Sequence, residues 1–279
     1  MCAPHVMDTV NRELSRRHAL GLLVAPAVAS TPLHSVAAPQ QNVMCHGGFS
    51  TIRDLTHVLT PNTPVFPGVK PIQVTPRITI ARNGIFGNEV TFTEHCGTHL
   101  DAPAHFAAEG RTTDQMDARE FFAPLAVISI ADRASQDSDT GVTVDDLRAW
   151  EREHGRLPEG AFVAMDSGWD RRVTDSKAFV NVDAQEVMHF PGFTVEAAEF
   201  LTKERVIVGV GVDTLSLDTG MFSVRGAYPA HLTFLPAGKY GLELMANLND
   251  VPPSGATLIV GAPKHQGGSG GPARVFAVS

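Results

Sequence analysis

The strongest constraint on the fold of this 279-residue chain comes from one short segment, residues 95–105. It carries four residues whose side chains commonly bind metals, all at odd positions: His95, His99, Asp101 and His105. In an extended strand, side chains at odd positions point to the same face. Imidazole and carboxylate groups are the usual protein ligands of zinc, manganese and iron. The segment therefore predicts a metal site; the competing interpretation is a polar surface loop.

A straight strand cannot complete such a site. At ~3.3 Å per residue, His95 and Asp101 would lie ~20 Å apart. Ligands of one ion need their Cα atoms within roughly 13 Å. The backbone must therefore bend, and Gly97 permits the bend at least steric cost, while Pro103 stiffens the exit. Cys96 falls at an even position, on the opposite face, which favours buried packing over metal ligation.

The remaining sequence predicts a mixed α/β domain that spans residues 38–279. Two amphipathic helices are expected, one that begins at Thr143 and runs to His154 and one over 194–201. Each helix precedes a strand, so part of the sheet should be parallel. The N-terminal half instead suggests antiparallel strands joined by Pro/Gly turns such as 61–64. Short apolar runs predict buried strands at 125–130, 161–165, 206–212 and 257–260.

Composition excludes several classes of partner and scaffold. Lys and Arg total 22 against 30 Asp and Glu, which gives a formal charge of -8, and aromatic residues make up only 7% of the chain. A nucleic-acid surface is therefore not expected. The three cysteines show no paired spacing, so no disulfide framework is expected either.

Residues 1–37 are typical of an export signal. Arg12, Arg16 and Arg17 precede an apolar run over 19–29, which is too short to span a bilayer. The adjacent arginines after Ser15 resemble a twin-arginine signal; the alternatives are a Sec signal or a frayed tail. We expect a periplasmic or secreted protein with no stable membrane span.

Five further stretches accompany the 95–105 segment, and together they resemble one family. They are Asp54-Leu55-Thr56, 63–68, 212–216, 230–248 and 270–275. Taken together, these motifs are similar to the metal-dependent cyclase family, which includes bacterial kynurenine formamidases and isatin hydrolases. The resemblance implies a single mixed-sheet domain of the swivelling β/β/α type. It also implies a homo-oligomer, a dimer or larger.

The resemblance implies a role for each matching position. A divalent cofactor, Mn²⁺ or Zn²⁺, would bind as one ion or two, and His105 would transfer protons beside it. The positions that match the family's metal ligands are His95, His99 and Asp101 for the primary ion, with His231 and Glu243 joining the shared aspartate for a second.

The stretch 142–193 is similar to the isatin-hydrolase branch, which is associated with manganese and opens a cyclic amide. The expected partner is then a small aromatic amide, hydrolysed at a C–N bond; the alternative substrate is N-formylkynurenine. Phe66, Trp169 and Phe193 are candidates to line an aromatic substrate pocket, and core packing explains each of them equally well.

Two other functional classes compete with a metal-dependent hydrolase. A nucleophilic hydrolase would use Ser167 or Cys96, but Ser167 does not lie in a G-x-S-x-G elbow. The second is a periplasmic metal- or ligand-binding protein that catalyses no reaction.

Overall fold

The computed structural model describes residues 48–224 and 226–279. Among them two compact units are present, the segment 74–91 and the remainder of the described chain. The predicted export signal, residues 1–37, lies outside the described residues. No helix within the described part of the chain is both long and apolar enough to cross a membrane.

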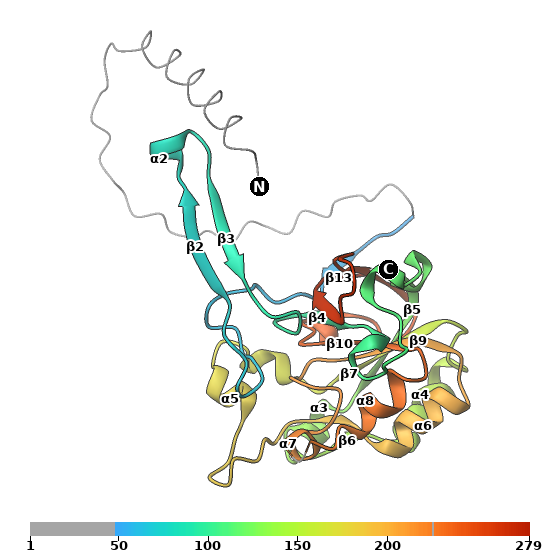
Figure 1. Ribbon diagram of the computed structural model, residues 1–279. Helices are drawn as coiled ribbons and strands as arrows, with labels where there is room; N and C mark the ends of the chain where they lie inside the picture. Colours follow the sequence, from blue (N-terminus) through green and yellow to red (C-terminus); the bar gives the residue numbers. More distant parts are fainter. Residues whose placement is uncertain (1–47, 225) are drawn as a thin grey trace. The chain divides into compact units, whose positions relative to one another are not determined.

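One mixed sheet of nine strands organises the larger unit (Figure 1). The spatial order of its strands is β1-β13-β11-β5-β7-β9-β10-β4-β12. Their bounds are Ile52–Asp54 (β1), His99–Asp101 (β4), Phe122–Ser129 (β5), Ala161–Asp166 (β7), Ile207–Val212 (β9), Tyr240–Glu243 (β10), Ala256–Gly261 (β11), Gly270–Pro272 (β12) and Arg274–Val278 (β13).

The four central strands of this sheet, β5, β7, β9 and β10, are parallel, and the strands on both sides of them pair antiparallel. The prediction of a mixed α/β domain is confirmed, as are all four predicted buried strands. β1 does pair antiparallel, but its partner is the distant β13, with Ile52 opposite Val278.

Both predicted helices are present and begin at the predicted caps. The Thr143 side chain accepts from the Asp146 amide at the start of α4, and that of Thr194 accepts from the Ala197 amide at the start of α6. A parallel strand pair needs such a crossover, and α4 and α6 lie between successive parallel strands along the chain. The α-helices of the larger unit are Ala131–Ala134 (α3), Val144–His154 (α4), Ser176–Val180 (α5), Val195–Lys203 (α6), Gly220–Val224 (α7) and Pro229–Phe234 (α8).

Shorter elements complete the description. β6 (Gly141–Val142) and β8 (Gly192–Phe193) form a small parallel sheet. In the smaller unit, β2 (Gln73–Ile78) and β3 (Gly87–Thr91) form a two-stranded sheet, joined through α2 (Ile80–Asn83). The 3-10 helices are Pro103–His105 (η1), Thr113–Gln115 (η2), Ala118–Phe121 (η3), Trp169–Arg172 (η4) and Leu248–Asp250 (η5).

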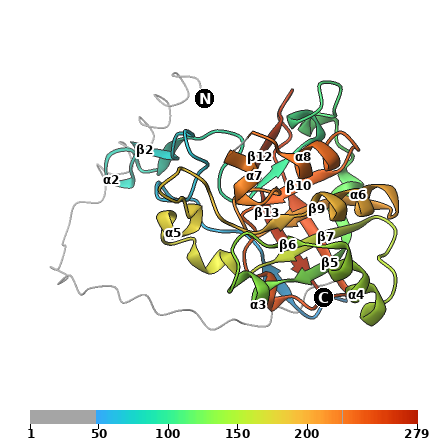
Figure 2. The ribbon, with the colours of Figure 1, turned by 90° about the horizontal axis from the view of Figure 1, so that it is seen from below.

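Both faces of the large sheet are buried, which explains why its central strands are continuously apolar. Alternate residues of β5 enter different cores: Leu125 and Val127 one, Ala126 and Ile128 the other. Helices α4, α6 and α8 pack on the second of these faces (Figures 1 and 2). The first core joins side chains from both ends of the strand order, β4 and β10 with β11 and β13, so the sheet curls around it.

Glycines in β9 leave room for an aromatic ring in the curled core. Phe162 of β7 lies in register with Gly209 and is fully buried. A Cβ at Gly209 would lie 2.7 Å from the Tyr240 carbonyl oxygen and 3.0 Å from the Phe162 ring. Any side chain at this position would therefore push a neighbouring strand or the ring.

We predict that Gly209→Ala lowers the free energy of unfolding by about 1–3 kcal/mol, because it overpacks a fixed backbone contact. The matched control is Gly261→Ala in β11, where the nearest atom to an added Cβ lies 3.3 Å away. That control should stay within about 0.5 kcal/mol of the wild type. Urea denaturation of the three proteins measures both values, and a Gly209→Ala protein as stable as the control would contradict the packing argument.

Candidate metal centre

The strands β4 and β10 bring three charged or ionisable side chains together at the curled end of the sheet. Their antiparallel register puts Glu243 opposite His99 and Gly241 opposite Asp101. Residues directly opposite on an antiparallel pair share a face, with Cβ atoms ~5 Å apart. Glu243 therefore reaches the same side as the two β4 residues. His231 joins them from α8 and His95 from the loop before β4.

Three glycines leave the space that this arrangement needs. Gly97 has a φ of +61° and makes the predicted bend, and a Cβ there would lie 2.0 Å from the Leu59 side chain. Gly241 and Gly270 pair with Asp101 from the strands on either side of it. A Cβ at Gly270 would lie 2.6 Å from the His95 ring. The loop can therefore fold back over β4 only with glycine at these positions.

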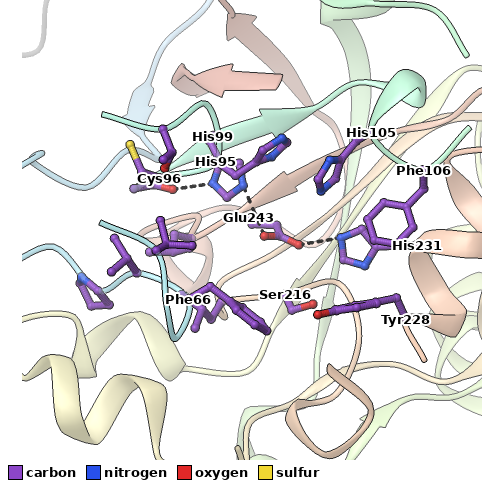
Figure 3. A pocket seen from close by; sticks show the side chains of 17 residues that line it. Phe66, His95, Cys96, His99, His105, Phe106, Ser216, Tyr228, His231 and Glu243 are labelled. Atoms are coloured by element: carbon purple, nitrogen blue, oxygen red, sulfur yellow. Dashed lines mark hydrogen bonds and ion pairs between the residues drawn. The ribbon is translucent and has the colours of Figure 1, made fainter. Parts of the chain in front are cut away.

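The structure gathers five predicted ligands into two overlapping donor groups. One ligand atom from each member of a group lies within 4.8 Å of the others. Figure 3 shows the histidines and Glu243 pointing into one cavity. The groups are His95, His99 and Asp101, and then Asp101, His231 and Glu243.

Two atoms at the centre of these groups are buried without a hydrogen-bond partner, His99 Nε2 and Asp101 Oδ2. Among the described residues only one other side-chain polar atom, His57 Nε2, is in this state. Buried polar atoms normally have partners, and an orphaned pair of a lone-pair nitrogen and a carboxylate oxygen suits a cation. The residues present therefore fit a divalent metal ion.

The outer nitrogens of the two central imidazoles are held so that their inner nitrogens face this point. His99 Nδ1 donates to the Gly97 carbonyl oxygen over 2.8 Å. His231 Nδ1 donates to Asp218 Oδ2 over 2.6 Å. Histidines that bind metals almost always have such a partner, which fixes the ring and its tautomer. Nε2 of each ring is thereby left available for a metal.

The electrostatics of the cluster also favour a cation. Burial lowers the pKa of His99, but the Asp101 and Glu243 carboxylates beside it outweigh burial and raise it to about 10. The pKa of His231 is raised in the same way, against burial, by Asp101, Asp218 and Glu243. The buried carboxylates thus hold positive charge at this point, and a divalent cation would compete with those protons.

His105 lies beside the donor groups but belongs to neither. Its ring stacks on that of His95, with centroids 3.8 Å apart, and it borders the cavity (Figure 3). Burial lowers the pKa of His105 below its usual value. A neutral imidazole in this position can accept a proton near neutral pH.

A cavity of about 340 Å³, which we call the inner cavity, opens onto the cluster. Its volume lies in the range of small-molecule sites. In Figure 3, Phe66, Ser216 and Tyr228 lie on the side of this cavity opposite His95 and His99, and the Tyr228 ring is 6.0 Å from that of His231 between centroids. Its other walls are largely apolar: Pro64, Val65, Val69, Phe106, Leu215 and Leu244.

Of the three predicted pocket aromatics, the structure brings only Phe66 to the inner cavity. Trp169 is 1% exposed and packs in a core cluster behind Leu215 and Leu244, with its indole nitrogen donating to the Phe179 carbonyl oxygen. Phe193 lies in the core under the helices. Its amide donates to the Leu217 carbonyl oxygen, next to Asp218.

The sequence analysis missed two residues that support the ligands. Asp218, which orients His231, is fully buried and lies two residues after the 212–216 motif. Ser269, hydrogen-bonded to His95 Nε2 over 2.9 Å, immediately precedes the 270–275 motif. Their position beside two motif segments of the family resemblance was the signal in the sequence that could have found them.

The two candidate nucleophiles, Ser167 and Cys96, do not lie in a nucleophile–base arrangement with a histidine. The Ser167 hydroxyl donates to Asp213 Oδ1 over 2.6 Å, so a carboxylate and not an imidazole is its partner there. Cys96 is buried as predicted, and burial raises the pKa of its thiol to about 11. Neither belongs to a donor group.

Comparison with known proteins agrees with this geometry. The family model described as "Putative cyclase" matches residues 53–219. Isatin hydrolase from Roseibium aggregatum is 34% identical over 81% of this chain and 90% of its own length. Kynurenine formamidase from Salinibacter ruber is 26% identical over 79% and 94%.

A solved structure gives the same result in three dimensions. The crystal structure of an isatin hydrolase bound to the product analogue thioisatinate superposes with a TM-score of 0.77. It is 33% identical and covers 82% of this chain and 92% of that one. The extent of these matches, together with the motif segments and the sheet that carries the donor groups, shows that this chain belongs to the cyclase family.

Proposed function

We propose that this protein is a metal-dependent hydrolase that opens the C–N bond of a cyclic aromatic amide of the isatin type. The observation that carries the proposal is the pair of orphaned atoms, His99 Nε2 and Asp101 Oδ2, at the junction of two donor groups beside an apolar cavity. Similarity to isatin hydrolases over most of the chain supports the substrate class. The formamidase relatives make N-formylkynurenine the second substrate to test.

The proposed cofactor is Mn²⁺ or Zn²⁺, bound as one ion or as two that share Asp101. Imidazole and carboxylate ligands suit both metals, and the donor groups contain no thiolate that would favour zinc. When bound, such an ion would polarise the amide carbonyl group and make water a stronger nucleophile at neutral pH.

The protein's own groups account for the proton transfers. His105 is neutral near pH 7 because burial lowers its pKa, so it can take a proton from the attacking water. As the C–N bond breaks, His105 returns that proton to the leaving nitrogen. The hydroxyl group added to the carbonyl carbon completes a carboxylic acid, which releases its proton to solvent and becomes a carboxylate. Phe66, Phe106 and Tyr228 supply aromatic faces that would hold a planar ring beside the cluster.

Removal of metal should abolish hydrolysis of isatin, because no ion would then polarise the amide carbonyl group or activate water. Dialysis against EDTA should reduce turnover to background, and added Mn²⁺ or Zn²⁺ should restore it. Elemental analysis of protein purified without added metal would identify the ion. Hydrolysis that survives EDTA would instead indicate a nucleophilic enzyme, and metal-loaded protein inactive on both isatin and N-formylkynurenine would indicate a binding protein.

Two histidine variants should separate ligation from proton transfer. We expect His99→Ala to lose both metal and activity, and His105→Ala to keep its metal while kcat falls roughly 100- to 10,000-fold. His154→Ala in α4 is the control and should retain both properties, because that side chain packs on Trp150 away from the centre. Circular dichroism checks folding of each variant, and an active His99→Ala protein without metal would refute the ligand assignment.

We also propose that the protein is exported to the periplasm or beyond, by the twin-arginine route, and works as a homo-oligomer. Arg16 and Arg17 before a weak apolar run support export. The hairpin of the smaller unit supports association, because apolar side chains exposed together on one element are typical of protein interfaces. Five of its large apolar side chains are exposed: Val74, Ile80, Ile85, Phe86 and Val90.

Expression of the full chain in a bacterium with a twin-arginine pathway tests both parts of this proposal. Fractionation should recover processed protein from the periplasm, while replacement of Arg16 and Arg17 by lysine should leave it in the cytoplasm. Light scattering of the processed protein should give at least twice the monomer mass. Cytoplasmic wild-type protein would argue against export, and a monomeric mass would argue against association.

A further inference from the structure

A second cavity, of about 430 Å³, adjoins the inner cavity. We call it the outer cavity. Phe66 and Tyr228 border both cavities, so these two rings stand between them. In Figure 3 the same two rings lie across the inner cavity from His95 and His99, with Tyr228 next to His231. A molecule held against the metal ligands could therefore extend between the rings and into the outer cavity.

The backbone around the outer cavity is held in an unfavourable conformation at two positions. Tyr228 has a φ of 42° and Glu186 a φ of 62°, both in the left-handed region that non-glycine residues seldom adopt. Such conformations persist only where the surrounding structure enforces them, and they cluster at functional sites. Hydrogen bonds from the Gln185 and Val187 amides to Asp183 Oδ1 fix the turn that carries Glu186.

The walls of the outer cavity define what it could bind. Met188 and Val182 provide apolar surface, Met188 fully buried and Val182 42% exposed. Glu186 is the one charged side chain among the described residues that line it. A ligand group that fits would be apolar along its length and would carry a cation or a hydrogen-bond donor at its end.

We propose that the outer cavity is a second subsite of the active centre, one that accepts the distal part of an extended aromatic amide. This inference rests on the proposed function. Phe66 and Tyr228 would hold the substrate between the two cavities, and Glu186 would favour a substituent that ends in an amine. The preferred substrate is then larger than isatin itself.

A substitution that fills the outer cavity provides the test. The substrates are isatin and a panel of isatins that carry a benzyl or an aminomethylbenzyl group on the nitrogen or on a ring carbon. Val182→Trp should lower kcat/KM for the best extended substrate at least about tenfold and for isatin no more than about twofold. The control, Val206→Trp, also replaces an exposed valine, lies outside both cavities and should change neither value.

Glu186→Gln tests the role of charge. It should reduce the preference for the aminomethylbenzyl substrate over the benzyl substrate by about two- to fivefold, the size expected of a partly exposed ion pair. The subsite proposal would be overturned if Val182→Trp lowered kcat/KM equally for isatin and the extended substrates, or lowered it for neither.

Failure of the proposed function would look different. The wild-type protein would then hydrolyse neither isatin nor any member of the panel. In that case the subsite can still be tested by calorimetry, which measures binding of the benzyl compound to the metal-loaded wild-type and Val182→Trp proteins. Weaker binding to the variant would support it, and equal binding or none to either protein would reject it.

Discussion

The buried carboxylate of Asp101 is the group on which the rest of the structure depends. It is 1% exposed, and His95 donates to it over 2.6 Å while His99 and His231 each lie 3.3 Å away. A carboxylate taken out of water is costly unless opposite charge and hydrogen bonds surround it. The carboxylate and imidazoles lower one another's free energy, and one carboxylate oxygen still has no hydrogen-bond partner. The protein thus concentrates negative potential where a cation fits.

The position of that carboxylate is a property of the whole sheet. β4 is only three residues long, and its register against β10 and β12 places glycines on both sides of Asp101. The parallel centre of the sheet positions β10. Leu100 and Leu242 point into the curled core, so the ligands next to them lie on the other face, on which α8 packs. Backbone contacts outside the cluster also contribute: the Phe193 amide donates to the Leu217 carbonyl oxygen, and Asp218, the next residue, orients His231.

The same arrangement separates the chemical roles of the histidines. Rings whose inner nitrogens face carboxylates, such as that of His99, have a raised pKa in the absence of a metal. The same carboxylates favour a cation at this point. His105 stacks on a neighbouring ring instead and has its pKa lowered by burial, which suits proton transfer. The four residues of the 95–105 segment all occupy odd positions. Their environments differ nevertheless, because the backbone bends at Gly97 and turns again in η1.

The sequence by itself determined the local features. The caps at Thr143 and Thr194, the buried strands and the bend at Gly97 depend on propensity and spacing within a few residues, and the odd positions of His95, His99 and Asp101 already predicted a shared site. Only the tertiary structure decided which distant residues complete it. The pairing of Glu243 with His99, the support of His231 by Asp218 and the burial of Trp169 away from the cavity all depend on long-range register and packing. An apolar ring has the same sequence signature in a core as in a pocket wall, because burial drives both, and only the packing of distant segments around it distinguishes them.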